Sequence, residues 1–184
     1  LLVHNNNSCS SKINTWNNSL ILKPQLKLEE RMSKAEKYRV LIQQINALVE
    51  GESDRIANTS NIIASLMQSF EFFWLGCYFV QGDELVLGPF QGPVACTRIK
   101  KGKGVCGAVW SNNEALLVPN VHDFPGHIAC SAESNSELVV PLLDNDDTVI
   151  GVLDADSREY DHFDEIDKTN FIIIAKIIAE KYVG

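Results

Sequence analysis

Three cysteines lie in two stretches of the chain that glycine and proline punctuate, and thiols are the most reactive groups this sequence offers. Cys96 and Cys106 belong to ACTRIKKGKGVCG over residues 95–107, and Cys130 ends PGHIAC over residues 125–130. The chain is acidic and its first residues do not have the pattern of a secretory signal. We therefore expect a cytoplasmic protein whose thiols are kept reduced and are available for redox or nucleophilic chemistry.

The residue types and their spacing allow three roles for these thiols. One is plain burial, because a free cysteine often acts as a small core residue. The second is a nucleophile with a resolving partner, in which attack on an oxidised sulfur leaves a sulfenic acid and a second cysteine closes a disulfide. The third is zinc, although no CxxC pair is present. Its candidate ligands are Cys96, Cys106, His122, His127 and Cys130.

The surroundings of each cysteine suggest different reactivities. Cys9 lies in an Asn- and Ser-rich stretch and Cys77 on the apolar face of a predicted strand, so we expect both to be inert. Cys106 lies near the start of a predicted short helix and follows a run of lysines. A helix N-terminus and nearby cations both lower the pKa of a thiol, so we predict a lowered pKa for Cys106.

Aromatic residues alternate along a predicted strand over residues 73–80. Side chains alternate between the two faces of a strand, so Trp74, Gly76 and Tyr78 should share one face. The other face should carry Phe73, Leu75, Cys77 and Phe79. The second set is apolar and should face helices, which leaves Trp74 and Tyr78 as the wall of a small-molecule pocket or as a second piece of core.

Acidic residues accompany this aromatic pair. In a predicted strand over residues 148–155, Ile150, Val152 and Asp154 share a face with Asp156 just beyond it, and Glu137 begins the preceding strand. One interpretation is a solvated strand end with turn-forming Asp. The other is a site for a small cationic ligand, held by ion pairing and a cation–π contact.

The elements that must position these side chains can be read from periodicity. Helices are predicted over residues 33–50, with a Ser33–Glu36 capping box, over residues 54–69, and from Asp164 to about residue 182. Further strands are predicted over residues 84–87, 115–118 and 137–143, with a short helix over residues 105–111. This order predicts an α+β fold, an antiparallel sheet backed by N- and C-terminal helices, with the loops on the other face.

Composition narrows the class of protein. Of 184 residues, 45% are hydrophobic, and the net charge of −8 argues against nucleic acid or an anionic membrane as partner. Residues 1–31 lack periodicity, and we interpret them as a disordered extension that precedes the natural start, while residues 32–184 form one domain. No apolar run is long enough to span a bilayer.

Long ordered motifs carry a family resemblance over roughly residues 34–183. They are LGPFQGPVACTRIKKGKGVCGAVW (87–110), LVPNVHDFPGHIACSAESNSELVVPL (117–142) and VIGVLDADS (149–157). They resemble the free methionine-(R)-sulfoxide reductases, enzymes built on a single GAF domain. Val94 departs from the family pattern, in which a more polar residue or lysine is expected, and residues 1–31 have no counterpart there.

The resemblance implies an activity and roles for the residues above. The family reduces free L-methionine-(R)-sulfoxide through a cysteine sulfenic acid and an intramolecular disulfide, which thioredoxin recycles without metal or organic cofactor. The positions that match the family make Cys130 the nucleophile, Cys96 the resolving cysteine and Cys106 the third family cysteine. The substrate-binding positions it implies are Trp74, Tyr78, Glu137, Asp154 and Asp156.

Two questions stay open at this point. Members of the family differ in how they divide the work between the positions of Cys106 and Cys130, and they are often homodimers. A GAF domain that only senses a small ligand would share the fold but would not need the three cysteines. Loss of two thiols per chain on adding the sulfoxide would indicate the enzyme, and no loss would indicate the sensor or a zinc site.

Overall fold

The computed structural model of the protein describes residues 32–126 and 132–183, so the predicted extension over residues 1–31 lies outside it. Four helices and six strands follow one another in the described part. They are α3 (Lys34–Val49), α4 (Arg55–Ser69), β1 (Trp74–Gln81), β2 (Glu84–Gln91), β3 (Arg98–Lys100), α5 (Gly104–Asn112), β4 (Leu116–Val118), the 3-10 turn η1 (Val121–Asp123), β5 (Ser136–Leu143), β6 (Val149–Ser157) and α6 (Glu165–Val183).

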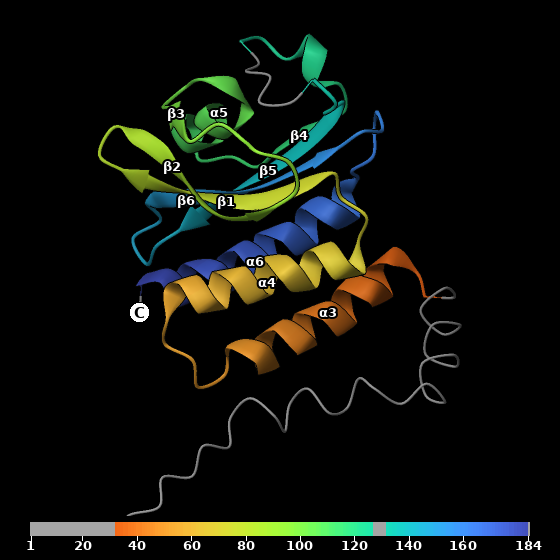
Figure 1. Ribbon diagram of the computed structural model, residues 1–184, viewed down its shortest axis with the longest axis vertical. Coiled ribbons are helices and arrows are strands. Elements are labelled where there is room, and N and C mark those ends of the chain that lie inside the picture. Colours follow the sequence, from red (N-terminus) through yellow and green to blue (C-terminus); the bar gives the residue numbers. More distant parts are fainter. Residues whose placement is uncertain (1–31, 127–131, 184) are drawn as a thin grey trace, which may run out of the picture. The chain divides into compact units, whose positions relative to one another are not determined.

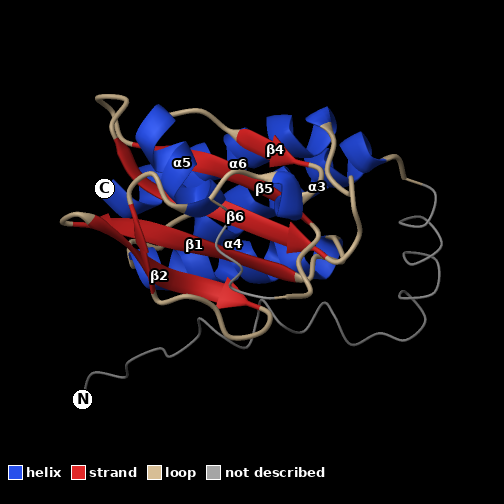
Figure 2. Ribbon diagram, turned by 90° about the horizontal axis from the view of Figure 1, so that it is seen from above, coloured by secondary structure: helices blue, strands red, loops and turns tan. Residues whose placement is uncertain are grey.

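The strands form one antiparallel sheet in the order β3-β2-β1-β6-β5-β4. The long helices α4 and α6, and α3 from Tyr38 onward, lie on one face, whereas α5 and the long loops lie on the other (Figures 1 and 2). This arrangement confirms the predicted α+β fold with its antiparallel sheet, and it places the candidate site on the loop face.

Local sequence accounts for the helix starts. The Ser33–Glu36 capping box is confirmed, because the Glu36 carboxylate accepts hydrogen bonds from the Ser33 amide and hydroxyl and the Ser33 hydroxyl accepts from the Glu36 amide. Asp54 caps α4 by accepting from the Ala57 amide. Asp164 opens α6 in the same way and accepts from the amides of Ile166 and Asp167.

Two apolar clusters fill the two faces of the sheet. The larger lies between the sheet and the long helices and includes Leu75, Cys77 and Phe79 of β1. The smaller lies under α5 and the loops and includes Trp74 and Tyr78 of the same strand. The alternation of β1 therefore separates a helix-packed core from a second cluster that surrounds the candidate site.

The sheet extends further than the sequence predicted. Strand β2 continues through Gly88 and Pro89 to Gln91, and β3 lies between the predicted strand over residues 84–87 and the predicted helix over residues 105–111. Gly88 and Pro89 stand opposite Cys77 in a bulge, beyond the last β2 residue that pairs with β3. A proline is tolerated there because its missing N–H interrupts no pairing on that edge.

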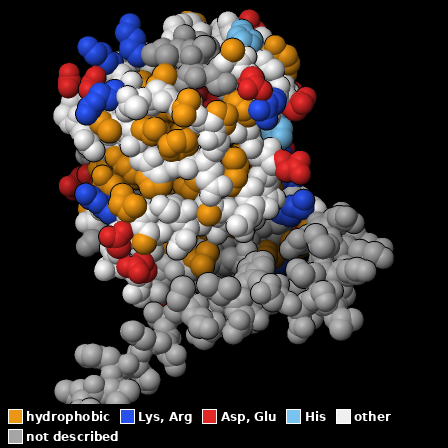
Figure 3. All heavy atoms as spheres, viewed as in Figure 1, with side chains coloured by type: hydrophobic (Ala, Val, Ile, Leu, Met, Phe, Trp, Pro, Cys, Tyr) orange, Lys and Arg blue, Asp and Glu red, His pale blue; other side chains and the backbone are white. Residues whose placement is uncertain are grey.

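The surface is mixed in character. On the face shown in Figure 3, apolar and neutral side chains occupy the middle, and basic and acidic side chains lie mostly toward the edges. None of the described helices is both long enough and apolar enough to cross a bilayer.

Candidate functional site

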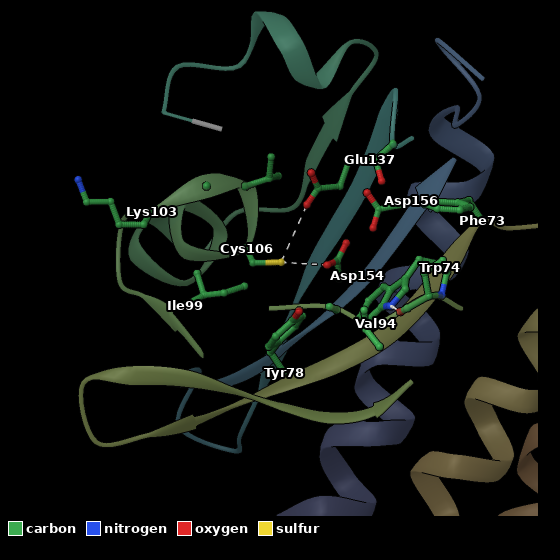
Figure 4. Close-up of a pocket in the computed structure, with 15 residues that line it drawn as sticks. Phe73, Trp74, Tyr78, Val94, Ile99, Lys103, Cys106, Glu137, Asp154 and Asp156 are labelled. Atoms are coloured by element: carbon green, nitrogen blue, oxygen red, sulfur yellow. Dashed lines mark hydrogen bonds between the residues drawn. The ribbon is translucent and has the colours of Figure 1, made fainter. Parts of the chain in front are cut away.

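Strand pairing brings the predicted aromatic and acidic residues into neighbouring rows across the sheet, with Tyr78 opposite Val152. Trp74 of β1 pairs with Asp156 of β6, which pairs in turn with Glu137 of β5. In the next row Gly76 pairs with Asp154. Paired residues point to the same face, so the three carboxylates and both aromatics lie together on the loop face and line one pocket (Figure 4).

Two face assignments made from the sequence are wrong. Phe73 precedes the first residue of β1, so the strand alternation does not extend to it, and it joins the loop-side cluster, where the Arg158 guanidinium lies 4.0 Å from its ring centroid. Ile150 packs against the helix-side core, because an irregularity in the β5–β6 pairing reverses the alternation before Gly151.

The aromatic wall also holds the segment that carries Cys96. The indole Nε1 of Trp74 donates to the carbonyl of Pro93 at 3.1 Å, and the Tyr78 hydroxyl donates to the carbonyl of Cys96 at 3.0 Å. Gly76 makes room for this arrangement, since a Cβ there would lie 2.5 Å from the Trp74 ring. The wall therefore links the pocket to the position of Cys96.

Cys106 enters the pocket from the first turn of α5. Gly104 begins that helix with a φ of +60°, a conformation that favours glycine, and a Cβ on Gly107 would lie 2.5 Å from the Lys100 carbonyl oxygen. The Sγ of Cys106 lies 3.1 Å from Asp154 Oδ2 and 4.0 Å from Glu137 Oε1 (Figure 4). A free thiol thus contacts two buried carboxyl groups.

Burial dominates the electrostatics of this cluster. Desolvation by burial raises the pKa of both Glu137 and Asp154 well above the ordinary range. Neighbouring negative charges raise it further, those of Asp154 and Asp156 for Glu137 and that of Asp156 for Asp154. Burial raises the pKa of Asp156 to about 6, with a Ser134 hydrogen bond opposing the rise. The predicted lowering of the Cys106 pKa is wrong, because burial and then the Asp154 and Glu137 charges raise it instead.

The acidic cluster has no partner of opposite charge among the described residues. The cation that lines the pocket is Lys103, and its ammonium points away from the carboxylates (Figure 4). Asp154 is only 6% exposed, and its Oδ1 has no hydrogen-bond partner in the described part of the chain. Buried acceptors without a donor are costly, so this pocket favours a cationic ligand or a proton.

The pocket is small. It holds about 50 Å³ of space that the centre of a water molecule can occupy, room for a few waters. Val94 lies at its rim and is 88% exposed. The arrangement suits the end of a small molecule that carries a positive charge.

Comparisons with known proteins identify the family. The sequence profile of the GAF domain matches residues 54–180. The crystal structure of the free methionine-R-sulfoxide reductase of Neisseria meningitidis, solved with its substrate, superposes with a TM-score of 0.80 at 47% identity and covers 83% of this chain and 92% of its own. The Escherichia coli enzyme of the same name is 44% identical over 74% of this chain and 83% of its own length. This chain belongs to the free methionine-(R)-sulfoxide reductases. GAF domain-containing protein A of Dictyostelium discoideum is 52% identical over 79% of this chain.

The cysteines of this reductase chain fall into three groups. Cys130, together with His127, lies outside the described residues. Cys96 is disulfide-bonded, whereas Cys77 and Cys106 carry free thiols. Cys77 is on the helix-side core face, as the sequence predicted.

The zinc ligand set considered from the sequence is not brought together in the described residues. His122 lies in η1, where its Nε2 is 3.1 Å from the Asn135 side-chain oxygen, and Cys96 is in a disulfide. Among the described members of that set, Cys106 is the one that belongs to a group of potential metal ligands, together with Glu137 and Asp154.

Sequence reasoning did not identify every residue of the reductase pocket. Ser134 is buried beside Asp156, and the backbone of Pro93 anchors Trp74. Ser134 belongs to an irregular segment without periodicity, and a backbone acceptor has no residue-type signature. The glycine that ends the PFQG motif is a sequence signal for the Pro93 contact. Gly92 has a φ of +125° and lies close to Trp74, where a Cβ would not fit.

Proposed function

We propose that this chain reduces free L-methionine-(R)-sulfoxide to L-methionine with its own thiols. The observation that carries the proposal is a group of three carboxyl side chains beside the free thiol of Cys106, with no paired cation among the described residues. Glu137 and Asp154 are buried and Asp156 is partly buried. A free amino acid brings an ammonium group to that cluster and a sulfoxide to the thiol side. The names of the relatives point to the same substrate.

The acidic cluster explains a preference for the free amino acid. The substrate ammonium would donate hydrogen bonds to Glu137, Asp154 and Asp156 and supply the missing positive charge. Within a polypeptide the same nitrogen is a neutral amide with one N–H. Leaving buried acceptors unpaired costs about 1–3 kcal/mol for each group, and more for charged ones. Peptide-bound sulfoxide would therefore bind far more weakly.

The reaction balances with the groups in the pocket. A thiolate attacks the sulfoxide, and a protonated carboxyl donates its proton to the sulfoxide oxygen. The S–O bond of the sulfoxide breaks, the oxygen with its proton becomes bonded to the cysteine sulfur as a sulfenic acid, and methionine leaves. A second thiol attacks the sulfenic sulfur, which closes a disulfide and releases water. The raised pKa values of Glu137 and Asp154 support the acid role, because burial favours the protonated form of each carboxyl group.

We assign the attacking thiol to Cys130 and the resolving thiol to Cys96, with Cys106 as the thiol held against the acids. The disulfide at Cys96 and the free thiol of Cys106 support a cycle whose final disulfide leaves Cys106 out. The raised pKa of Cys106 also makes it a weak nucleophile in the ligand-free pocket. Trp74 and Tyr78 would pack on the substrate side chain.

The proposal also covers the catalytic domain, the cellular location and the reductant. Residues 32–184 form the catalytic domain, the protein acts in the cytoplasm under oxidative stress, and thioredoxin reduces the disulfide by exchange at Cys96. A homodimer remains a prediction of the family resemblance.

The test is a coupled assay that follows NADPH oxidation with thioredoxin and thioredoxin reductase. Turnover with free L-methionine-(R)-sulfoxide and not with the S-epimer supports the proposal, as does loss of two thiols per chain in the absence of reductant. Ligand binding without turnover or thiol loss would instead identify a sensor domain. Replacement of Cys130 and of Cys106 by serine, each alone, then assigns the attacking thiol.

A further inference from the structure

We propose that Cys106, Glu137 and Asp154 form an inhibitory site for a divalent cation of borderline softness, with Zn²⁺ as the natural member of that class. The ion would occupy the place that the proposed function gives to the substrate ammonium, so the inhibition rests on that function. The binding of the ion does not, because it depends only on the geometry and donor chemistry of the three side chains.

The distances match a tetrahedral centre. One ligand atom from each of the three residues lies within 4.8 Å of the other two. The Cys106 Sγ is 3.1 Å from an oxygen of Asp154 and 4.0 Å from an oxygen of Glu137. Bonds of about 2.3 Å to sulfur and about 2.0 Å to oxygen at a tetrahedral angle separate the two donors by about 3.5 Å. The observed separations lie on either side of that value, so small side-chain rotations complete the centre.

A second observation points to a ligand in the cluster. Asp154 Oδ1 is buried and has no hydrogen-bond partner among the described residues, and the Asp154 side chain points into the pocket (Figure 4). Asp156 adds a further carboxyl group at the same place. A divalent ion would satisfy this oxygen and neutralise a cluster that the described cations leave unpaired.

The donor set selects the metal. One thiolate and two carboxylates suit Zn²⁺, Co²⁺ or Cd²⁺, whereas Mg²⁺ and Ca²⁺ prefer an all-oxygen shell. Three protein ligands leave a fourth position for water. The free thiol of Cys77 cannot replace Cys106 as the metal ligand, because it lies on the helix-side core face among apolar side chains.

The site does not depend on the reduced state of the enzyme. Cys106 carries a free thiol in a structure in which Cys96 is disulfide-bonded. The same three donors are therefore present before and after the catalytic disulfide forms. We expect the ion to bind both forms, and this distinguishes the site from a zinc site built on Cys96.

The direct test is a Cd²⁺ and Co²⁺ titration of the full chain prepared without reductant, in a Cys9→Ser background. Thiolate-to-metal charge-transfer absorption should saturate at one equivalent per chain. Cys106→Ser should abolish the band, Asp154→Asn should weaken binding at least tenfold, and Cys77→Ala should change neither. Circular dichroism confirms that each variant is folded. Absence of the band in the parent protein, or its persistence in Cys106→Ser, would overturn the site.

The inhibition is tested separately. Zn²⁺ should inhibit the reductase, and the apparent inhibition constant should rise linearly with the concentration of free L-methionine-(R)-sulfoxide. Inhibition that does not respond to substrate would overturn the shared position. If the chain proves to have no reductase activity, the proposed function fails while the metal titration still decides the site.

Discussion

The two faces of the sheet each bury a free thiol, and only one of these thiols lies in a pocket. Cys77 packs with Leu75 and Phe79 against the long helices, whereas Cys106 lies against Asp154 and Glu137 under the loops. Burial is the main cause of the raised pKa of both thiols. A buried thiol therefore becomes part of a site through its neighbours and its access to ligand, not through its burial.

The comparison extends to stability. The helix face buries a large apolar cluster, and a core of that kind stabilises the fold. The loop face retains Glu137 and Asp154, each 6% exposed, and neither has a positively charged partner among the described residues. Such groups destabilise the free protein and favour a cationic ligand, a compromise that is common at functional sites.

The largest effect should come from removing the charge that most distinguishes the loop face. Asp154→Asn takes away a ligand of the ammonium and the partner of the Cys106 thiol, so we expect kcat/KM to fall by about 10³-fold. Asp146→Asn, in the exposed β5–β6 turn, is the matched control and should leave kcat/KM unchanged. Near-normal activity in Asp154→Asn would remove this residue from the site.

A smaller effect should follow from loosening the loop that carries Cys96. Tyr78→Phe deletes the hydroxyl that donates to the Cys96 carbonyl and leaves the aromatic ring. A hydrogen bond of about 1 kcal/mol corresponds to disulfide closure slowed by about fivefold. Rapid-quench thiol counting after one turnover measures that rate, with exposed Tyr160→Phe as control. Unchanged closure would show that the hydroxyl does not position Cys96.

The loop face should also make stability depend on pH. The pKa of Asp156 is about 6 in the folded chain against an ordinary 3.8, so the folded state binds more protons between these values. The free energy of unfolding should then fall as pH rises from about 4 to about 6, by about 1–3 kcal/mol. Asp156→Asn should flatten this dependence in urea titrations across that range. A wild-type profile that rises over that range would contradict the assignment.

The smallest effect on activity should come from the helix face. Cys77→Ala removes a buried sulfur from the apolar core, which should cost about 1–2 kcal/mol of stability. We expect kcat/KM to stay within about twofold, because Cys77 does not line the pocket. A large loss of activity with unchanged stability would contradict the claim that Cys106, but not Cys77, belongs to the site.

Much of the site was predictable because β-strands impose regular alternation. Once Trp74 and Asp156 lie on neighbouring antiparallel strands, period two places Tyr78 and Asp154 on the same face. Glu137 joins them because it pairs with Asp156 on the next strand. Prediction failed where that regularity ends, at Phe73 before β1 and at Ile150 beside the pairing irregularity.

Other features depend on contacts between residues distant in sequence. The sequence predicted a lowered pKa for Cys106 from its helix and lysines. Burial raises that pKa instead, and the charges of Asp154 on β6 and Glu137 on β5 raise it further. The three-residue strand β3 has too little periodicity to recognise, and it forms because β2 offers it an edge.

The most direct test of the account compares two substrates that differ only at the nitrogen. The coupled assay should be run with free L-methionine-(R)-sulfoxide and with its N-acetyl derivative, whose amide carries no charge. We predict that kcat/KM for the free form exceeds that for the acetylated form by at least about 10³-fold, because the acidic cluster requires a cation. Equal kcat/KM values would contradict the claim that Glu137, Asp154 and Asp156 recognise the substrate ammonium.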